Sequence, residues 1–249
     1  MANYGPTSVP FFLVGGRDLL ASIVFDFEDG IEADTEESHG LGGTGWKEHK
    51  ATGIRKAMLS QRGFFDDAVD GVNAALNGAQ MTAQVITYGV SGGAIGAKLI
   101  GLSGAFASTY VRALSRTGIH KANATYTVTG VKEEGRLLHG KTAEAGATWN
   151  TDATPADDGV SSSNAGGSAY LQVPALTLGG YTSATVKIRH SSDNVTFVDL
   201  GTFAVVTAKP TAQRITVPGT VFRYLSSSGA WNGAGAGQSI TPVVGFARG

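Results

Sequence analysis

The chain has 249 residues, of which 42% are hydrophobic, and its formal net charge is -1. This length can bury one large core or two modest ones, and the usual size of domains favours two. A charge so close to zero gives the whole chain no attraction to nucleic acid or to an anionic membrane, so we expect a protein partner. The absence of cysteine excludes disulfides, thiolate metal sites and cysteine nucleophiles.

The apolar stretch from Ser8 to Val14 is too short to cross a bilayer and follows no basic segment, so no signal peptide is predicted. We expect the protein to be made in a cytoplasm and kept there until it is assembled or released.

The residue pattern predicts a β-rich first domain. The 36 glycines are scattered between strand-like runs, which is typical of tight turns. Leu19 to Phe27 alternates between two faces with period two, as a strand does. Further strands, each bounded by glycine or polar turns, are predicted at Lys56–Phe64, Gln80–Val90, Ala94–Leu102, Ala105–Leu114 and Ala122–Val131.

One helix is predicted, from Phe65 to Leu76. Asp66 and Asp67 suit its first turn, apolar residues recur on one side, and Asn77-Gly78 supplies a stop. We expect its apolar side to pack on a sheet.

A second domain follows a run of turn-forming residues. We place a first domain at residues 1–145, a linker at 146–167 and an antiparallel β-sandwich at 168–249, because apolar periodicity disappears in the linker and charge becomes sparse after it. Its strands are predicted at Ala169–Leu178, Thr182–His190, Thr196–Val206, Gln213–Val217, Val221–Ser227 and Ser239–Ala247.

The segment from Asp26 to Lys56 is the most distinctive part of the chain. An acidic limb turns at a glycine-rich tip and returns through a basic limb, with few apolar residues. We interpret it as an arm that orders against neighbouring subunits, where limbs of identical copies pair, with Trp46 as an apolar anchor. The residues assigned to inter-subunit contact are Asp29, Glu32, Asp34, Glu36, Glu37, Trp46, Lys47, Lys50, Arg55 and Lys56.

Two other interpretations of this segment stay open at the level of sequence. One is a flexible charged loop, since long loops inside compact domains are either functional or disordered. The other is a metal site, because Asp34, Glu36, Glu37 and His39 lie close together, although their spacing does not follow the order of a calcium loop.

No coherent set of catalytic residues is present, and we predict a protein that is not an enzyme and needs no cofactor. Gly135 to Thr142 fits the spacing of a phosphate-binding loop, but charged residues precede it and no helical pattern follows. The histidines are not paired for zinc, and no serine lies in a nucleophile elbow. A nucleotide-using enzyme is therefore the weaker alternative.

A modest basic cluster is formed by Arg112, Arg116, His120 and Lys121 near Tyr110. Contact with nucleic acid is one use of such a cluster. Because the chain has so little excess positive charge, pairing between subunits is the favoured use.

Several strings resemble the tail tube (major tail) proteins of long, non-contractile-tailed bacteriophages. The resemblance covers nearly the whole chain but includes no mechanistic signature. The strings are Trp46–Arg55, Leu59–Asp67, Tyr88–Val90, His120–Ala124, Tyr170–Val173, Val186–Asp193 and Val244–Arg248.

The resemblance implies a structural virion protein, made in the host cytoplasm and located in the tail. It implies a β-sandwich flanked by a helix, homo-hexameric rings whose inner sheets close into one barrel, and stacking of the rings through a long hairpin arm. The partners would be further copies, other tail proteins at the tube ends, and double-stranded DNA that passes without specific binding. Glu28, Glu32 and Asp34 are the acidic residues we expect to face the lumen, where carboxylates repel DNA.

The second domain then resembles sandwiches that decorate the outside of some tail tubes. An alternative function is therefore surface decoration or carbohydrate binding, with Tyr170, Tyr181, Tyr224 and Trp231 as aromatic platforms. A further alternative is that this domain helps to join subunits.

Overall fold

The structure is a computed structural model that describes residues 9–20, 24–38, 48–68, 71–80, 82–159 and 162–249. It confirms the mainly β fold class, with one short helix in this part of the chain. The first half contains β1 (Phe12–Val14), β2 (Arg17–Asp18), β3 (Val24–Ser38), β4 (Glu48–Phe64), α1 (Val72–Ala79), β5 (Gln84–Gly89), β6 (Lys98–Ala113), β7 (Lys121–Val128) and β8 (Lys132–His139). The second half contains β9 (Thr148–Asn150), β10 (Ala156–Asp157), β11 (Gly167–Thr177), β12 (Ser183–Ser191), β13 (Val198–Thr202), β14 (Thr211–Val217), β15 (Tyr224–Asn232) and β16 (Ser239–Arg248).

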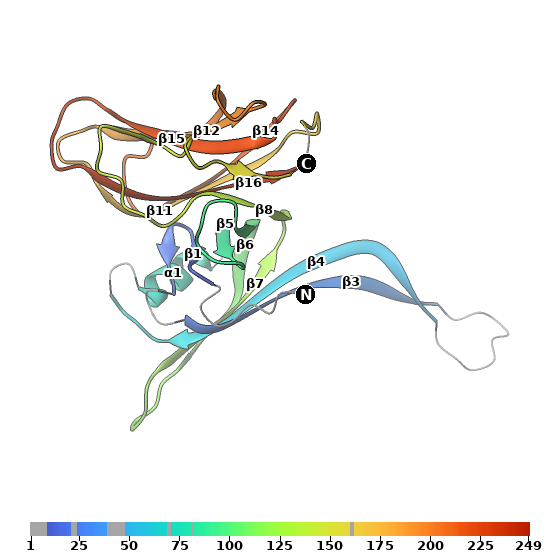
Figure 1. The fold of residues 1–249 in the computed structure, drawn as a ribbon. Coiled ribbons are helices and arrows are strands. Elements are labelled where there is room, and N and C mark those ends of the chain that lie inside the picture. The colour runs from blue at the N-terminus through green and yellow to red at the C-terminus, as the bar shows by residue number, and fades with distance from the viewer. Residues whose placement is uncertain (1–8, 21–23, 39–47, 69–70, 81, 160–161) are drawn as a thin grey trace.

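The strands form two sheets. The larger sheet runs in the order β14-β11-β16-β8-β6-β5-β1-β2, and β7, β4 and β3 branch from β6. The smaller sheet runs β10-β15-β12-β13, with β9 beside β15. Figure 1 shows the C-terminal strands layered over the N-terminal ones, and the β3–β4 ribbon leaving the body.

Each half has its own hydrophobic core. The first core packs α1 against β4 to β7, and Leu59, Leu76 and Tyr126 are fully buried in it. The second core fills the space between the smaller sheet and the C-terminal strands of the larger sheet, and it includes Ile188 and Phe246. A third cluster joins the halves and consists of Phe11, Leu13, Leu99, Leu137 and Val243.

The larger sheet continues from one half into the other, because β8 pairs with β16. The buried Gln172 adds a polar bridge: its Oε1 accepts a hydrogen bond from Gly16 N at 2.7 Å, and its Nε2 donates to Val85 O at 3.0 Å. The division into residues 1–145, 146–167 and 168–249 stays a prediction. The segment placed there as a linker supplies β9 and β10 to the smaller sheet.

The helix prediction was wrong in its boundaries. The helix begins after Gly71 and ends at Ala79, past the expected stop at Asn77-Gly78, with no acidic residue in its first turn. Asp66 forms a turn before it instead, because its carboxylate accepts from Ala68 N at 3.0 Å. Aspartate side chains compete in this way with the helical backbone, which explains the displaced start.

Two strand predictions also need correction. The predicted strands Ala94–Leu102 and Ala105–Leu114 merge into the single strand β6, which starts at Lys98, ends at Ala113 and continues through Gly104, a residue with a φ of 63°. Glycine adopts this left-handed conformation without a steric penalty, so it bends the strand rather than ending it. Strand β8 was not predicted, and it contains most of the residues that fit the phosphate-loop spacing.

Candidate assembly surfaces

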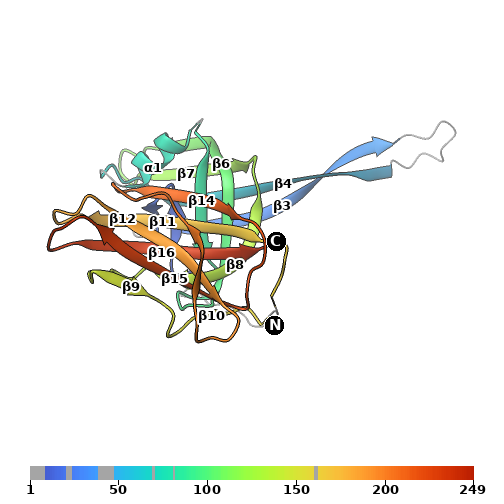
Figure 2. The same ribbon diagram turned by 90° about the horizontal axis from the view of Figure 1, so that it is seen from above.

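The β3–β4 ribbon is the most extended feature of the molecule. Its two strands pair in antiparallel register from Val24 opposite Gly63 to Ser38 opposite Glu48. Beyond the pair formed by Glu32 and Lys56, neither strand pairs with any other described strand. We call this projecting part, residues 32–38 and 48–56, the arm. Figures 1 and 2 both show it reaching away from the body.

Residues of opposite charge occupy opposite register positions along the arm. The register places Glu32 opposite Lys56 and Glu36 opposite Lys50, and such cross-strand pairs stabilise a ribbon. The acidic limb therefore pairs with the basic limb of its own chain. The described part of the segment is a ribbon rather than a flexible loop, and the contact of its residues with other copies stays a prediction.

The other residues assigned to the arm have different placements. Asp29 forms an ion pair with Lys132 of β8, within its own chain. Asp34 lies at a register shift in β3, Glu37 is opposite His49, and Arg55 is opposite Ala33. Trp46 and Lys47 lie outside the described residues, as does His39 of the suggested metal cluster.

Four strands at the base of the arm form a strip in the order β6, β7, β4, β3. Both edges of the strip are open in the described part of the chain. Strand β3 pairs with β4 alone, and the side of β6 away from β7 has its last partner at Ala105, which is opposite Gln84 of β5. The sequence showed the strands but not which of them would lie at the edges, because pairing order depends on tertiary structure.

The two faces of the strip differ in character. One face packs on the first core through Leu59, Gln61 and Tyr126, where the Tyr126 hydroxyl donates to Gln61 Oε1 at 3.1 Å. Burial raises the pKa of Tyr126, so this phenol stays neutral. The alternation of strand residues places a charged set on the other face, here called the open face. That set is Asp26, Glu28, Glu32, Lys56, Arg62 and Lys121, all exposed.

The open face is of mixed charge rather than acidic. Register places Asp26 opposite Arg62 and Glu32 opposite Lys56, whereas Glu28 is opposite Ser60. Of the three residues predicted to face a lumen, Glu28 and Glu32 thus share the open face. Their assignment to a lumen stays a prediction.

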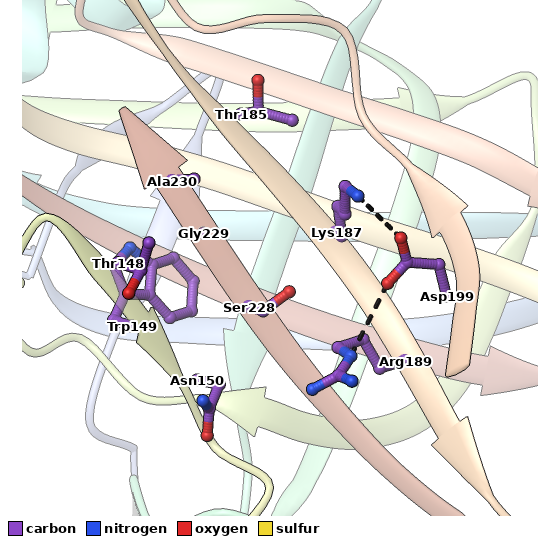
Figure 3. Close-up of a pocket in the computed structure, with 10 residues that line it drawn as sticks. All are labelled: Thr148, Trp149, Asn150, Thr185, Lys187, Arg189, Asp199, Ser228, Gly229 and Ala230. Carbon is purple, nitrogen blue, oxygen red and sulfur yellow. Dashed lines mark hydrogen bonds and ion pairs between the residues drawn. The ribbon is translucent and has the colours of Figure 1, made fainter. Parts of the chain in front are cut away.

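A groove of about 270 Å³, here called the polar groove for the polar side chains that line it beside Trp149, lies on the outer side of the smaller sheet (Figure 3). Asp199 there pairs with Lys187 at 2.6 Å and with Arg189 at 3.6 Å. Asn150 and Ser228 are opposite each other on neighbouring strands of its floor. The groove offers hydrogen-bonding groups from three strands, β9, β12 and β15, together with Asp199 of β13.

The aromatic residues predicted as platforms are dispersed. Tyr170 is buried, and its hydroxyl donates to Glu133. The guanidinium of Arg223 lies 5.2 Å from the ring centre of Tyr224. Tyr181 and Trp231 form a tilted pair with ring centres 5.7 Å apart. None of the four lines the polar groove.

The residues with phosphate-loop spacing lie in an antiparallel setting. Gly135 to His139 form the end of β8, which pairs with β6 and β16, and Lys141 forms an ion pair with Asp18. That setting differs from the strand, loop and helix that cradle a phosphate. Among the described residues, no three His, Asp or Glu side chains are grouped to hold a metal ion. No helix in the described chain is long and apolar enough to span a membrane.

No protein-family model and no curated protein matches the chain. The solved structures that are similar to it include the following three. A chain of the virion of a native gene transfer agent has a TM-score of 0.37 and 16% identity, covering 53% of this chain and 98% of that one. A chain of the sheath-tube complex of an extracellular contractile injection system has a TM-score of 0.37 and 14% identity, covering 53% and 90%. The Dit protein of SPP1, described as a hub of the adsorption apparatus of phages that infect Gram-positive bacteria, has a TM-score of 0.34 and 13% identity, covering 96% and 98%.

Proposed function

We propose that this protein is a structural tail protein that forms rings through the open edges of its four-stranded strip and stacks the rings into a tube through its arm. The observation that carries the proposal is the strip itself, which has an even number of antiparallel strands and two open edges. Open edges favour pairing with another chain unless they are covered.

The directions of the two edge strands allow copies to pair head to tail in an antiparallel arrangement. Strands alternate across the order β6, β7, β4, β3, so the two edge strands run in opposite directions. If β3 of one copy lies beside β6 of the next, the antiparallel pattern continues without interruption. A contact of this heterologous kind repeats from copy to copy and closes into a ring when the rotation allows. Six copies per ring is the number that the resemblance to tail tube proteins implies.

In such a ring, the open face lines the lumen and the core face points outward. The three carboxylates and three cationic side chains on the open face leave it without net charge. DNA binds tightly where many cationic groups replace its counterions, and a neutral wall provides few such contacts. The open face therefore suits the passage of double-stranded DNA without retention.

Replacement of the arm tests the proposal. In the variant, Asn-Gly replaces residues 33–55 and joins Glu32 to Lys56, which are directly opposite and so suit a two-residue hairpin. We expect the variant to keep the wild-type circular dichroism spectrum and to form rings but no tubes in electron micrographs. A K187A/D199A variant, which removes an exposed ion pair far from the strip, should form normal tubes. Tubes of normal length without the arm, or only monomers from the wild type at all concentrations, would contradict the proposal.

The polar groove favours a second candidate function, carbohydrate binding by the C-terminal sandwich. The exposed Asn150 and Asp199 and the half-buried Lys187 and Ser228 are suited to hydrogen-bonding a polar ligand on the outer surface. Glycan-array binding by the full chain that is lost in K187A/D199A would support this role, and no binding by the wild type would exclude it.

A further inference from the structure

The hairpin that connects β6 and β7 ends in an exposed tip, residues 111–121, here called the basic tip. Every residue of it is exposed, including Val111 at 50%, Leu114 at 71% and Ile119 at 68%. The apolar side chains at its end line a groove of about 480 Å³ together with Phe64. Exposed apolar side chains gathered in one place mark a surface that another molecule covers.

The basic tip is also purely cationic. No Asp or Glu occurs between Lys98 and Lys132, whereas the tip contains Arg112, Arg116 and Lys121. None of these three cations forms an ion pair within the described part of the chain. Residues 111–121 therefore carry three positive charges and no carboxylate of their own, and Asp67 of the neighbouring segment lies near Tyr110.

The arm has the complementary charge. It contains five Asp or Glu residues and three Lys or Arg residues, and strand β3 as a whole carries seven carboxylates and no cationic residue. Complementary potentials of this kind select partners and fix their register. In the register of the ribbon, Glu37 is opposite His49, and Asp34 falls at the shift between Ala33 and Thr35.

The arm and the basic tip lie at opposite ends of the same strip. At one end, Phe64 pairs with Lys121 beside the tip, and at the other end Ala57 pairs with Val128 just before the arm begins. Figure 1 shows the β6–β7 hairpin and the arm projecting from the body in different directions. A copy stacked along the strand direction therefore brings its arm toward the tip end of its neighbour.

We propose that the basic tip is the docking site for the arm of a second copy in the adjacent ring. This inference rests on the proposed function and identifies the surface that receives the arm. The apolar groove at Leu114 and Ile119 is covered in the contact, and the carboxylates of the arm meet Arg116 and Lys121. Within a single ring, the contact is not needed.

Charge reversal in matched pairs tests the contact by electron microscopy and sedimentation. In R116E/K121E, we expect rings to persist and tubes to be lost, because the reversed tip repels the arm. The arm variant D34K/E37K should show the same loss. Combining all four substitutions should restore tubes of wild-type length, since the charges are then exchanged. K209E reverses one exposed cation on the C-terminal half, away from the arm and the tip, and should leave tubes intact.

The outcomes separate this contact from the proposed function. Wild-type tubes together with unchanged tubes in R116E/K121E would overturn the docking site and leave the tail-protein proposal standing. Failure of the four-fold variant to restore tubes, with each pair alone abolishing them, would also overturn it. A wild type that forms neither rings nor tubes would overturn the proposed function, and this contact with it.

Discussion

At the scale of single residues, Glu133 joins three strands of the larger sheet. Its carboxylate accepts hydrogen bonds from Ser168 at 2.8 Å, from the Tyr170 hydroxyl, and from Arg214 at 3.1 Å. Burial by itself raises the pKa of Glu133, but the hydrogen bonds from Arg214, Tyr170 and Ser168 outweigh it, so the pKa lies below its usual value. A lowered pKa in the folded state means that the ionised form stabilises the fold.

We therefore expect the stability contributed by Glu133 to depend on pH. It is fully present above the unfolded-state pKa of about 4.3 and is lost as pH falls through the lower folded-state pKa. The variant E133Q should lower the free energy of unfolding by about 1–3 kcal/mol at neutral pH. The difference in free energy of unfolding between E133Q and the wild type should become smaller in acid, as measured by urea denaturation across a pH series.

The neighbouring Glu134 provides the control, because it lies on the same strand and is exposed. E134Q should change stability by less than about 0.5 kcal/mol at neutral pH. The role assigned to Glu133 would be contradicted if E133Q and E134Q lowered the free energy of unfolding equally. It would also be contradicted if the stability difference between E133Q and the wild type grew in acid.

At the scale of elements, β6 and β11 meet through a glycine. A Cβ atom on Gly101 of β6 would lie 2.4 Å from the ring of Tyr170 on β11. Tyr170 is 1% exposed and held by Glu133, so it has little room to move. The close approach of the two halves at this point thus depends on the missing side chain.

The substitution G101A should lower the free energy of unfolding by about 1–3 kcal/mol, because it overpacks a closed contact. Gly30 of β3 is the matched control, since a Cβ atom there would meet nothing within 4 Å. G30A should leave stability almost unchanged. Thermal unfolding of dilute monomer measures both variants. If G101A unfolds at the same midpoint temperature as G30A, the ring of Tyr170 can move aside and the prediction is wrong.

At the scale of the whole molecule, the open edges of the strip predict which strands of neighbouring copies lie side by side. The chain has no cysteine, so introduced thiols report only on designed contacts. Glu28 on β3 and Thr109, Val111 and Ala113 on β6 all belong to the open face by register. Disulfides form when Cα atoms lie within about 4–7 Å, the spacing of neighbouring strands.

We expect at least one double variant, E28C combined with T109C, V111C or A113C, to give an oxidised ladder of many subunits on a non-reducing gel. Each single variant should give no product larger than a dimer, because head-to-tail contacts need one thiol at each edge. If all three double variants stop at dimers in assembled protein, the pairing of β3 with β6 between copies is wrong.

Some of the fold could be predicted because it depends on local patterns. Alternation identified β11, β12, β14 and β16 within a few residues, and the acidic and basic limbs of the arm stand out in composition alone. The helix start was misplaced because Asp66 forms a turn of its own, a choice that composition does not reveal. Strand β8 was missed because Lys132, Glu133 and Glu134 read as a charged loop, whereas Glu133 is neutralised by Arg214 from a distant strand.

The sequence by itself determined the mainly β class, the two-sided strand pattern, the charge of the arm and the clustering of cations near residue 116. These properties follow from residue types at short spacings, where side-chain alternation and turn preference act. Only the tertiary structure decided which strands are edges, that the limbs of the arm pair in one chain, and that the arm and the basic tip lie at opposite ends of one strip. Those features depend on hydrogen bonds and packing between segments far apart in the sequence, whose register no local pattern specifies.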